Sequence, residues 1–323
     1  MAPDTGFGPT PAAGGRTELD AIERMKELDF EQRARLRGLA ASVLSLRFLR
    51  LAWRRLWLDT APTAAAGVPH PPAGTVALTF VGHATVMITT ARARLMTDPM
   101  LENSLGGLPR ARAGAVDAED LSQVDLVLIS HAHRDHLSRA TLRRLPLKAT
   151  IVVPPRCGSL VDDLGFARVI ELGVGHTFSF ADVEIIAVPV QHSGTRGVLD
   201  RRRRGVSGYV VRAGGRVIYF AGDTGYFSGF AEIGRRYNPD LALLPIAGYQ
   251  PAPFRREHMS PLDAVYALQD LGARVLVPIG YGSFQLSYEP LDEPLTWLRE
   301  LAKDKDLGEA LTVLEHGQTC LLR

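Results

Sequence analysis

The hydrophobic positions after residue 75 fall into short runs separated by glycine and proline, a pattern that predicts β-strands. One run, VDLVLIS at 124–130, is continuous rather than alternating, as is typical of a strand buried on both faces. The other expected strands are TVALTFVGHATVMITT, ARLMTDP, ATIVVPP, VEIIAVPVQHS, GYVVRAGGRVIYFAGDTG, PDLALLPIAG, RVLVPIG and ALTVLEHGQTCLL.

Helical patterns occur between these strands. A short helix is predicted over 138–145. A longer one is predicted over 260–272, with Ser260 as its N-cap, Pro261 at its first position and Gly272 at its end. Because strands and helices alternate without a break, residues 75–323 are predicted to form one α/β domain.

The first 74 residues differ from the rest of the chain in composition and in the structure they predict. Residues 1–16 are rich in Pro, Gly and Ala and are predicted to be disordered. Residues 17–59 predict a helical extension and residues 60–74 a linker. Within the extension, residues 42–58 carry arginines on one stripe beside leucines and tryptophans. This helix either packs on the domain as a brace or makes peripheral contact with an anionic membrane surface.

The net charge and the cysteine content argue against some classes of function and indicate a cellular compartment. A formal net charge of +2 and the lack of a basic, aromatic-rich motif argue against nucleic acid as a partner. Cys157 and Cys320 are far apart, which argues against a thiolate zinc site and favours a reducing compartment. Neither a secretory signal nor a spanning apolar run is visible, so the sequence predicts a cytoplasmic protein, with peripheral membrane contact as the alternative.

The chemistry is concentrated in the stretch HAHRDH, residues 131–136. Side chains two positions apart in an extended loop point the same way, so His131 and His133 can bind one ion, while Asp135 and His136 can reach a second. His192 and Asp223 follow other expected strands and can complete the site. Imidazole and carboxylate ligands favour zinc, or manganese or iron, over calcium.

These motifs resemble the metallo-β-lactamase fold hydrolases, whose signature is H-x-H-x-D-H. The blocks FVGHATVMI, TDP, ISHAHRDHL, VPVQHSG, FAGDTGYFSGFAEIGRRYNPDLALLPI, EHMSPLDAV and EHGQT are similar to the branch of N-acyl-phosphatidylethanolamine phospholipase D and ascorbate-phosphate lactonases. The resemblance covers about residues 75–323. It implies an α/β fold, an αββα sandwich of the metallo-β-lactamase type, here with a helical N-terminal extension.

The resemblance also implies a site with two zinc ions. His131, His133 and His192 would bind the first ion. Asp135 and His136 would bind the second, and Asp223 would bridge both. Asp98, in TDP, would orient a ligand by a hydrogen bond.

One position departs from the family. Where the family has the histidine of H-W-G-T-F, this chain has Gly280 in IGYGSF, and glycine has no side chain to donate. The second ion is then expected to bind more weakly. Tyr281 or Glu289 are alternative ligands, although nothing in their spacing shows it.

The predicted function is metal-dependent hydrolysis in which cations lower the pKa of a water and Asp135 and Asp223 are catalytic, Asp223 by fixing the position of that water. His258, in REHMSP, would contact the substrate headgroup. The substrate would be a phospholipid cleaved in the manner of phospholipase D. Two alternatives stay open: a lactonase or other hydrolase of small anionic esters, and a metal-binding protein with little activity because of Gly280. The sequence does not indicate an oligomeric state.

Overall fold

Two β-sheets form the centre of the molecule in a computed structural model that describes residues 67–196 and 204–322. The first sheet has seven strands in the order β15-β1-β2-β3-β6-β7-β8. Its strands are β1 (Val76–Gly82), β2 (Thr85–Thr89), β3 (Arg94–Thr97), β6 (Leu126–Leu128), β7 (Thr150–Val153), β8 (Arg168–Glu171) and β15 (Thr319–Leu322).

The second sheet has six strands in the order β14-β13-β12-β11-β10-β9. They are β9 (Thr177–Phe180), β10 (Val183–Val188), β11 (Gly208–Ala213), β12 (Arg216–Phe220), β13 (Leu241–Pro245) and β14 (Val275–Ile279). A separate small hairpin joins β4 (Ser104–Leu105) to β5 (Leu108–Pro109).

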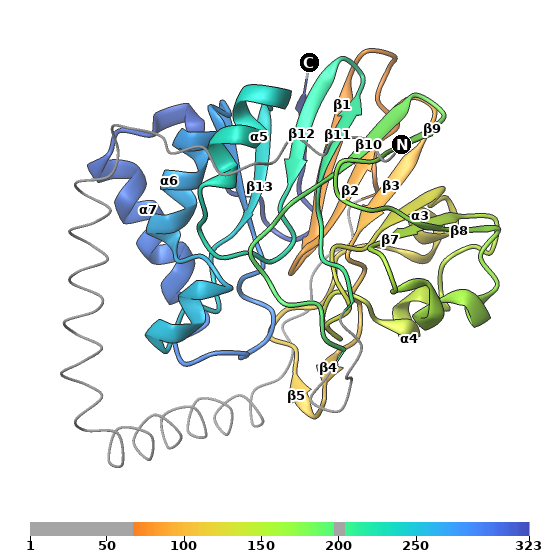
Figure 1. The fold of residues 1–323 in the computed structure, drawn as a ribbon, viewed down its shortest axis with the longest axis horizontal. Coiled ribbons are helices and arrows are strands. Elements are labelled where there is room, and N and C mark those ends of the chain that lie inside the picture. Colours follow the sequence, from red (N-terminus) through yellow and green to blue (C-terminus); the bar gives the residue numbers. More distant parts are fainter. Residues whose placement is uncertain (1–66, 197–203, 323) are drawn as a thin grey trace, which may run out of the picture.

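Helices cover the outer faces of the two sheets, so that the layers run helix, sheet, sheet, helix (Figure 1). On one side lie α5 (Gly229–Tyr237), α6 (Pro261–Leu271) and α7 (Glu293–Asp304), and on the other α3 (Ala118–Ser122) and α4 (Arg139–Leu142). Short 3₁₀ turns lie at η1 (Gly158–Leu160), η2 (Asp162–Leu164), η3 (Ala252–Arg256) and η4 (Gly308–Ala310). The predicted αββα sandwich is confirmed for the described residues.

The continuous apolar run of β6 explains how two cores share one sheet. Leu126 and Leu128 belong to the larger hydrophobic cluster, which includes residues of both sheets, whereas Val127 belongs to a second cluster with residues of α3 and α4. Leu95 and Met96 of β3 divide in the same way. Because side chains alternate between the faces of a strand, a sheet covered on both sides needs apolar residues at every position.

The predicted helix over 260–272 is confirmed with its caps. Ser260 and Asp263 exchange hydrogen bonds with each other's backbone N–H in a capping box, and Gly272 ends the helix in the left-handed conformation. The sequence prediction missed α3, α5, α7, β8, β9 and the small hairpin of β4 and β5. It was wrong to extend a strand through residues 310–318, where only an isolated bridge at Leu311 precedes β15.

The predictions for residues 1–16, 17–59 and 42–58 lie outside the described residues. Of the predicted linker 60–74, the described part from 67 onward has neither helix nor strand, and it lies against the domain. The Val68 side chain is buried, and its backbone N–H donates to Asp120 Oδ2 at 2.9 Å. Within the described ranges, no helix is long and apolar enough to cross a membrane.

The direction of the strands determines where the candidate site residues lie. Strands β3, β6 and β7 are parallel, as are β12, β13 and β14, so within each set the carboxyl ends lie at the same edge. Asp98 directly follows β3, the 131–136 loop follows β6, Asp223 follows β12 and Gly280 follows β14. Side chains that are more than a hundred residues apart in sequence therefore meet at one end of the sandwich.

Candidate metal centre

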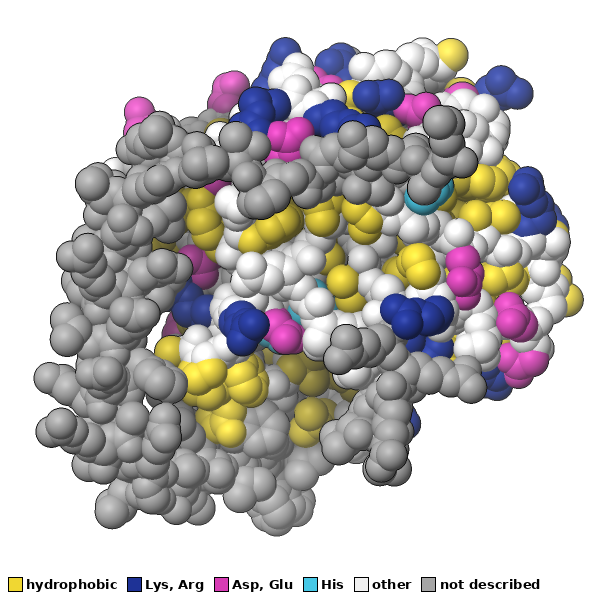
Figure 2. Space-filling model, viewed as in Figure 1, with side chains coloured by type: hydrophobic (Ala, Val, Ile, Leu, Met, Phe, Trp, Pro, Cys, Tyr) yellow, Lys and Arg dark blue, Asp and Glu magenta, His cyan; other side chains and the backbone are white. Residues whose placement is uncertain are grey.

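The loop after β6 holds the first histidines. It turns back on itself through hydrogen bonds from the backbone N–H groups of His136 and Leu137 to the carbonyl of His133, and it ends at Ser138, the N-cap of α4. His131 and His136 are buried, and His133 is partly exposed. Figure 2 shows histidine on the visible face only as small areas between other side chains.

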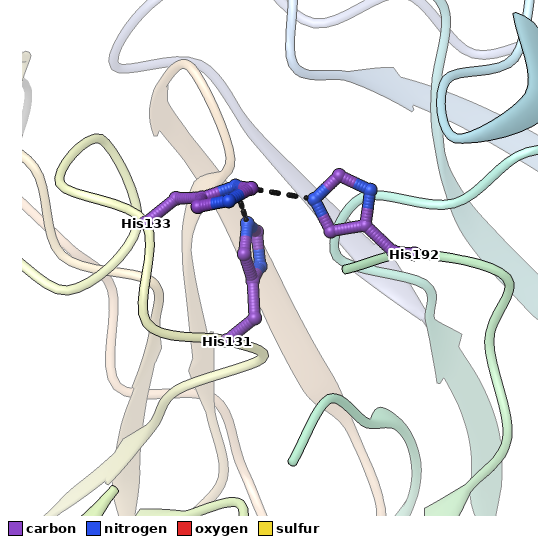
Figure 3. Close-up of side chains that lie close together, drawn as sticks. All are labelled: His131, His133 and His192. Carbon is purple, nitrogen blue, oxygen red and sulfur yellow. Dashed lines mark hydrogen bonds between the residues drawn. The ribbon is translucent and has the colours of Figure 1, made fainter. Parts of the chain in front are cut away.

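Three imidazoles from two loops face one another at the core of the site (Figure 3). His131 Nε2 lies 2.9 Å and His192 Nε2 lies 3.2 Å from the same atom, Nδ1 of His133. One nitrogen of each ring lies within 4.8 Å of the others. We call His131, His133 and His192 the histidine group.

Hydrogen bonds on the far side of these rings direct their lone pairs inward. His192 Nδ1 donates to the carbonyl of Glu257 at 3.0 Å, which leaves Nε2 unprotonated in the neutral ring. Ser130 Oγ donates to Asp98 Oδ2 at 2.5 Å, so its remaining contact, at 2.8 Å, accepts from His131 Nδ1. Outer contacts of this kind fix the tautomer that a metal ligand needs.

A second group contains two carboxylates. His136 Nε2 lies 3.1 Å from Asp223 Oδ2 and 3.5 Å from Asp135 Oδ2, while its Nδ1 donates to Asp98 Oδ2 at 2.7 Å. We call Asp135, His136 and Asp223 the carboxylate group. His136 Nε2 is buried and has no partner of good hydrogen-bond geometry among the described residues. With Nδ1 already donating, a proton or a metal cation must lie between this nitrogen and the two carboxylates.

The electrostatics of the two groups differ. Burial, followed by repulsion from neighbouring imidazoles, lowers the pKa of His131 well below its usual range. Burial also lowers the pKa of His192, to about 4. For Asp223 burial opposes ionisation, but His136 outweighs it and holds the carboxyl pKa well below its ordinary value. Neutral imidazole and ionised carboxylate are the forms that bind metal.

His83 and His258 each lie beside one carboxylate of the carboxylate group. His83 Nε2 lies 3.3 Å from Asp135 Oδ2, and His258 Nε2 lies 3.7 Å from Asp223 Oδ2. His258 was predicted from the sequence to contact the substrate, and this role stays a prediction, whereas His83 was not selected from the sequence as a site residue. The signal for His83 was the block FVGHATVMI.

A cavity of about 100 Å³ opens onto these side chains. Its polar lining includes His83, His133, Asp135, Asp223 and His258, and the rest includes Phe254, Phe284 and Leu286, which we call the apolar rim. A larger and more open hollow of about 510 Å³ lies at the β9–β10 and β11–β12 turns and is lined by no histidine. Side chains of the histidine group and the carboxylate group therefore line the smaller cavity and not the larger one.

Neither substitute suggested for the missing ligand reaches the site. Both oxygens of Glu289 accept hydrogen bonds, from the backbone N–H groups of Gly248 and Gln250 and from the Ser287 hydroxyl. The Tyr281 ring stacks on Phe80 with the centroids 5.9 Å apart. Gly280 itself lines the cavity.

The donor set fits two cations: the three rings of the histidine group offer nitrogens within 4.8 Å of one another, and Asp135 and Asp223 lie 3.5 and 3.1 Å from His136 Nε2, which lacks a hydrogen-bond partner of good geometry among the described residues. The model of the beta-lactamase superfamily domain matches residues 93–281. This chain belongs to the β-lactamase superfamily. A metal-dependent hydrolase of Caldivirga maquilingensis is 33% identical over 216 residues, which cover 66% of this chain and 86% of that protein.

Two further relatives extend the comparison. The N-acyl-phosphatidylethanolamine-hydrolyzing phospholipase D 1 of Caenorhabditis elegans is 33% identical over 253 residues, covering 72% of this chain and 71% of that protein. The structure of Igni18, a metallo hydrolase of Ignicoccus hospitalis, superposes with a TM-score of 0.60 at 26% identity and covers 77% of this chain and 99% of that one. These likenesses agree with the family resemblance drawn from the sequence motifs.

Proposed function

We propose that this chain, a metal-dependent hydrolase of the β-lactamase superfamily, cleaves a phosphodiester bond of a glycerophospholipid in the manner of a phospholipase D. One observation carries the proposal: the cavity joins the ionisable groups directly to the apolar rim. Phe254 and Leu286 are 40% and 37% exposed, although both are large hydrophobic side chains. In a glycerophospholipid, the charged diester would lie against the ionisable groups and an acyl chain against the apolar rim. The likeness to the nematode phospholipase supports the same choice.

The residues would divide between two ions. The histidine group would hold one, Asp135 and His136 would hold the other, and Asp223 would contact both. When bound, the ions supply Lewis acidity, which lowers the pKa of a coordinated water and stabilises negative charge on the substrate. Zinc suits this set of nitrogen and oxygen ligands, with manganese and iron as alternatives.

The side chains of the protein then have separate tasks. The ionised carboxylates of Asp135 and Asp223 accept hydrogen bonds from the attacking water and orient it. His258, 3.7 Å from Asp223 and partly exposed, is positioned to donate a hydrogen bond to a phosphate oxygen. The apolar rim excludes bulk water from the cavity. Water attacks phosphorus, the bond from phosphorus to the headgroup oxygen breaks, and phosphatidate and the protonated headgroup alcohol leave.

The test uses purified chain, stripped of metal and reloaded with zinc, manganese or iron. It is given an N-acyl-phosphatidylethanolamine, a small chromogenic phosphodiester and a sugar lactone in parallel. We expect release of the alcohol from the phospholipid and metal-dependent cleavage of the small diester. Lactone cleavage with intact phosphodiesters would replace this proposal with the lactonase alternative. Bound metal without turnover of any of the three would favour a metal-binding protein of little activity.

A further inference from the structure

We propose that His83 is the ligand that completes the second ion site in place of the side chain that Gly280 lacks. The inference rests on the proposed two-ion function and concerns the carboxylate group alone. It assigns a metal-binding role to a residue that lies 48 positions before the metal-binding loop begins, at the turn between β1 and β2.

The backbone places His83 directly beside the empty ligand position. The N–H of Gly280 donates to the carbonyl of His83 at 3.0 Å, so the end of β14 and the β1–β2 turn are in contact. A Cβ built on Gly280 would lie 3.9 Å from Asp223 Oδ1, so a side chain there would begin beside the carboxylate group. His83 and Gly280 line the same cavity.

The His83 ring reaches the atoms that a second ion would need. Its Nε2 is 3.3 Å from Asp135 Oδ2, and one nitrogen of His83 lies within 4.8 Å of ligand atoms of both Asp135 and His136. The ring is held in place because Phe284 packs edge-on against it at 5.7 Å and only 4% of the residue is exposed. A rigid, buried imidazole loses little side-chain entropy on binding a cation.

The backbone of His83 is in the left-handed region, with φ at +59°. Residues other than glycine adopt this conformation uncommonly, and backbone strain of this kind clusters at functional sites. A glycine or asparagine would make the same turn with less strain, but neither would bring an imidazole to Asp135.

His258 is the competing candidate for the second ion, but its neighbours are different residues. Its ring lies 5.0 Å from that of His192, and its ligand atom groups with those of His192 and Asp223 rather than with Asp135 and His136. It is also closer to the exposed Phe254, against which its ring lies at 6.4 Å, as suits a substrate contact. His83 alone among the described histidines outside the signature groups with both Asp135 and His136.

The experiment measures zinc binding, not turnover. Metal-free full-length protein is titrated with zinc by calorimetry, and bound metal is counted after gel filtration, for wild type, His83→Gln and His83→Gln/Gly280→His. Glutamine keeps a hydrogen-bond donor for Asp135 but is a poor zinc ligand. A side chain at Gly280 has room, because the added Cβ meets Pro245 at an ordinary contact distance of 3.4 Å, although the φ of +72° makes histidine there somewhat strained. His176→Gln, at an exposed turn, is the matched control.

We expect wild type and His176→Gln to bind two zinc ions, and His83→Gln to keep the first while losing affinity for the second by more than about 100-fold, which exceeds the loss from a mere outer contact. Adding Gly280→His should restore the second ion. Retention of the first ion shows that His83→Gln is folded. Unchanged second-ion affinity in His83→Gln overturns the inference and leaves the phosphodiesterase proposal standing.

A measurement on the unaltered protein avoids dependence on variants. In ¹⁵N-labelled wild-type protein, the second equivalent of zinc should shift the ring Nε2 resonance of His83 to the range of metal-bound imidazole. A resonance that stays in the range of a free or hydrogen-bonded imidazole at two equivalents contradicts the inference. If phosphodiesters are not cleaved but this shift occurs, the substrate proposal fails and the metal site stands.

Discussion

The histidine group and the carboxylate group lie side by side but are built in different ways. In the histidine group, two rings come from one loop, and contacts with Ser130 and the Glu257 carbonyl direct the rings. In the carboxylate group, two acids surround one imidazole, and the family position for a further ligand is Gly280. The first group is complete within the H-x-H motif and one later histidine, whereas the second depends on a residue from the β1–β2 turn. We therefore expect the first ion to bind more tightly.

The largest effect should come from breaking the histidine group. His133→Ala removes the ring whose Nδ1 lies against both His131 and His192. The first ion should be lost and hydrolysis should fall by about 1000-fold or more, because a catalytic metal supplies several kcal/mol of transition-state stabilisation. Metal content and initial rates check this. Activity within tenfold of wild type would mean that the chemistry does not depend on this group.

A substitution at Asp98 is expected to weaken metal binding at both groups, but by less than the loss of His133. Asp98 Oδ2 accepts from His136 and from Ser130, which in turn contacts His131. In Asp98→Asn both ions should bind about 10- to 100-fold more weakly, as is usual when an outer partner of a ligand is lost. Competition with a zinc chelator measures both affinities. A loss confined to one ion would show that Asp98 supports only that group.

The apolar rim distinguishes substrate binding from metal binding. Phe254→Ala should raise KM for a long-chain phospholipid by about tenfold, the equivalent of roughly 1.4 kcal/mol of lost apolar contact. It should leave KM for the small phosphodiester and the affinity for both ions unchanged. Leu147→Ala, which truncates a 61% exposed side chain outside the cavity, is the control. Equal rises for both substrates would argue against an acyl chain on the rim.

The smallest effect concerns a histidine outside both groups. His316 packs edge-on against Phe80, and its Nδ1 donates to the Ala113 carbonyl at 3.0 Å. Burial lowers its pKa, so below about pH 6.5 the unfolded chain takes up a proton that the folded chain does not. This contribution to stability is present at neutral pH and is lost as the pH falls from about 6.5 toward the folded pKa.

Urea unfolding of the metal-free protein at pH 7 and pH 5.5 tests whether the stability contribution of His316 falls on acidification. The advantage of wild type over His316→Gln in unfolding free energy should shrink at the lower pH. An advantage that grows on acidification would mean that the folded protein stabilises the charged form of His316.

Some elements could be predicted because their signals are local. Ser260, Pro261 and Gly272 mark the ends of α6 within its own sequence, and the unbroken apolar run of β6 indicates burial on both faces. Helix α5 (Gly229–Tyr237) was missed because no side-chain cap marks its start. Its residues also lie inside a block that was interpreted only as a family motif. Strands β8 and β9 are exposed or half-buried, so they lack the continuous apolar pattern that identified the others.

The sequence by itself indicated most of the side chains proposed to bind a cation, because the spacing in residues 131–136 places donors on one short loop. It also identified Gly280 as the departure. Only the tertiary structure decided that His83 lies beside Gly280 and that Phe254 and Leu286 form the rim, and it excluded Glu289 and Tyr281. The reason is that these contacts join segments far apart in the chain, which are brought together by the burial of two sheets against each other and not by any local pattern.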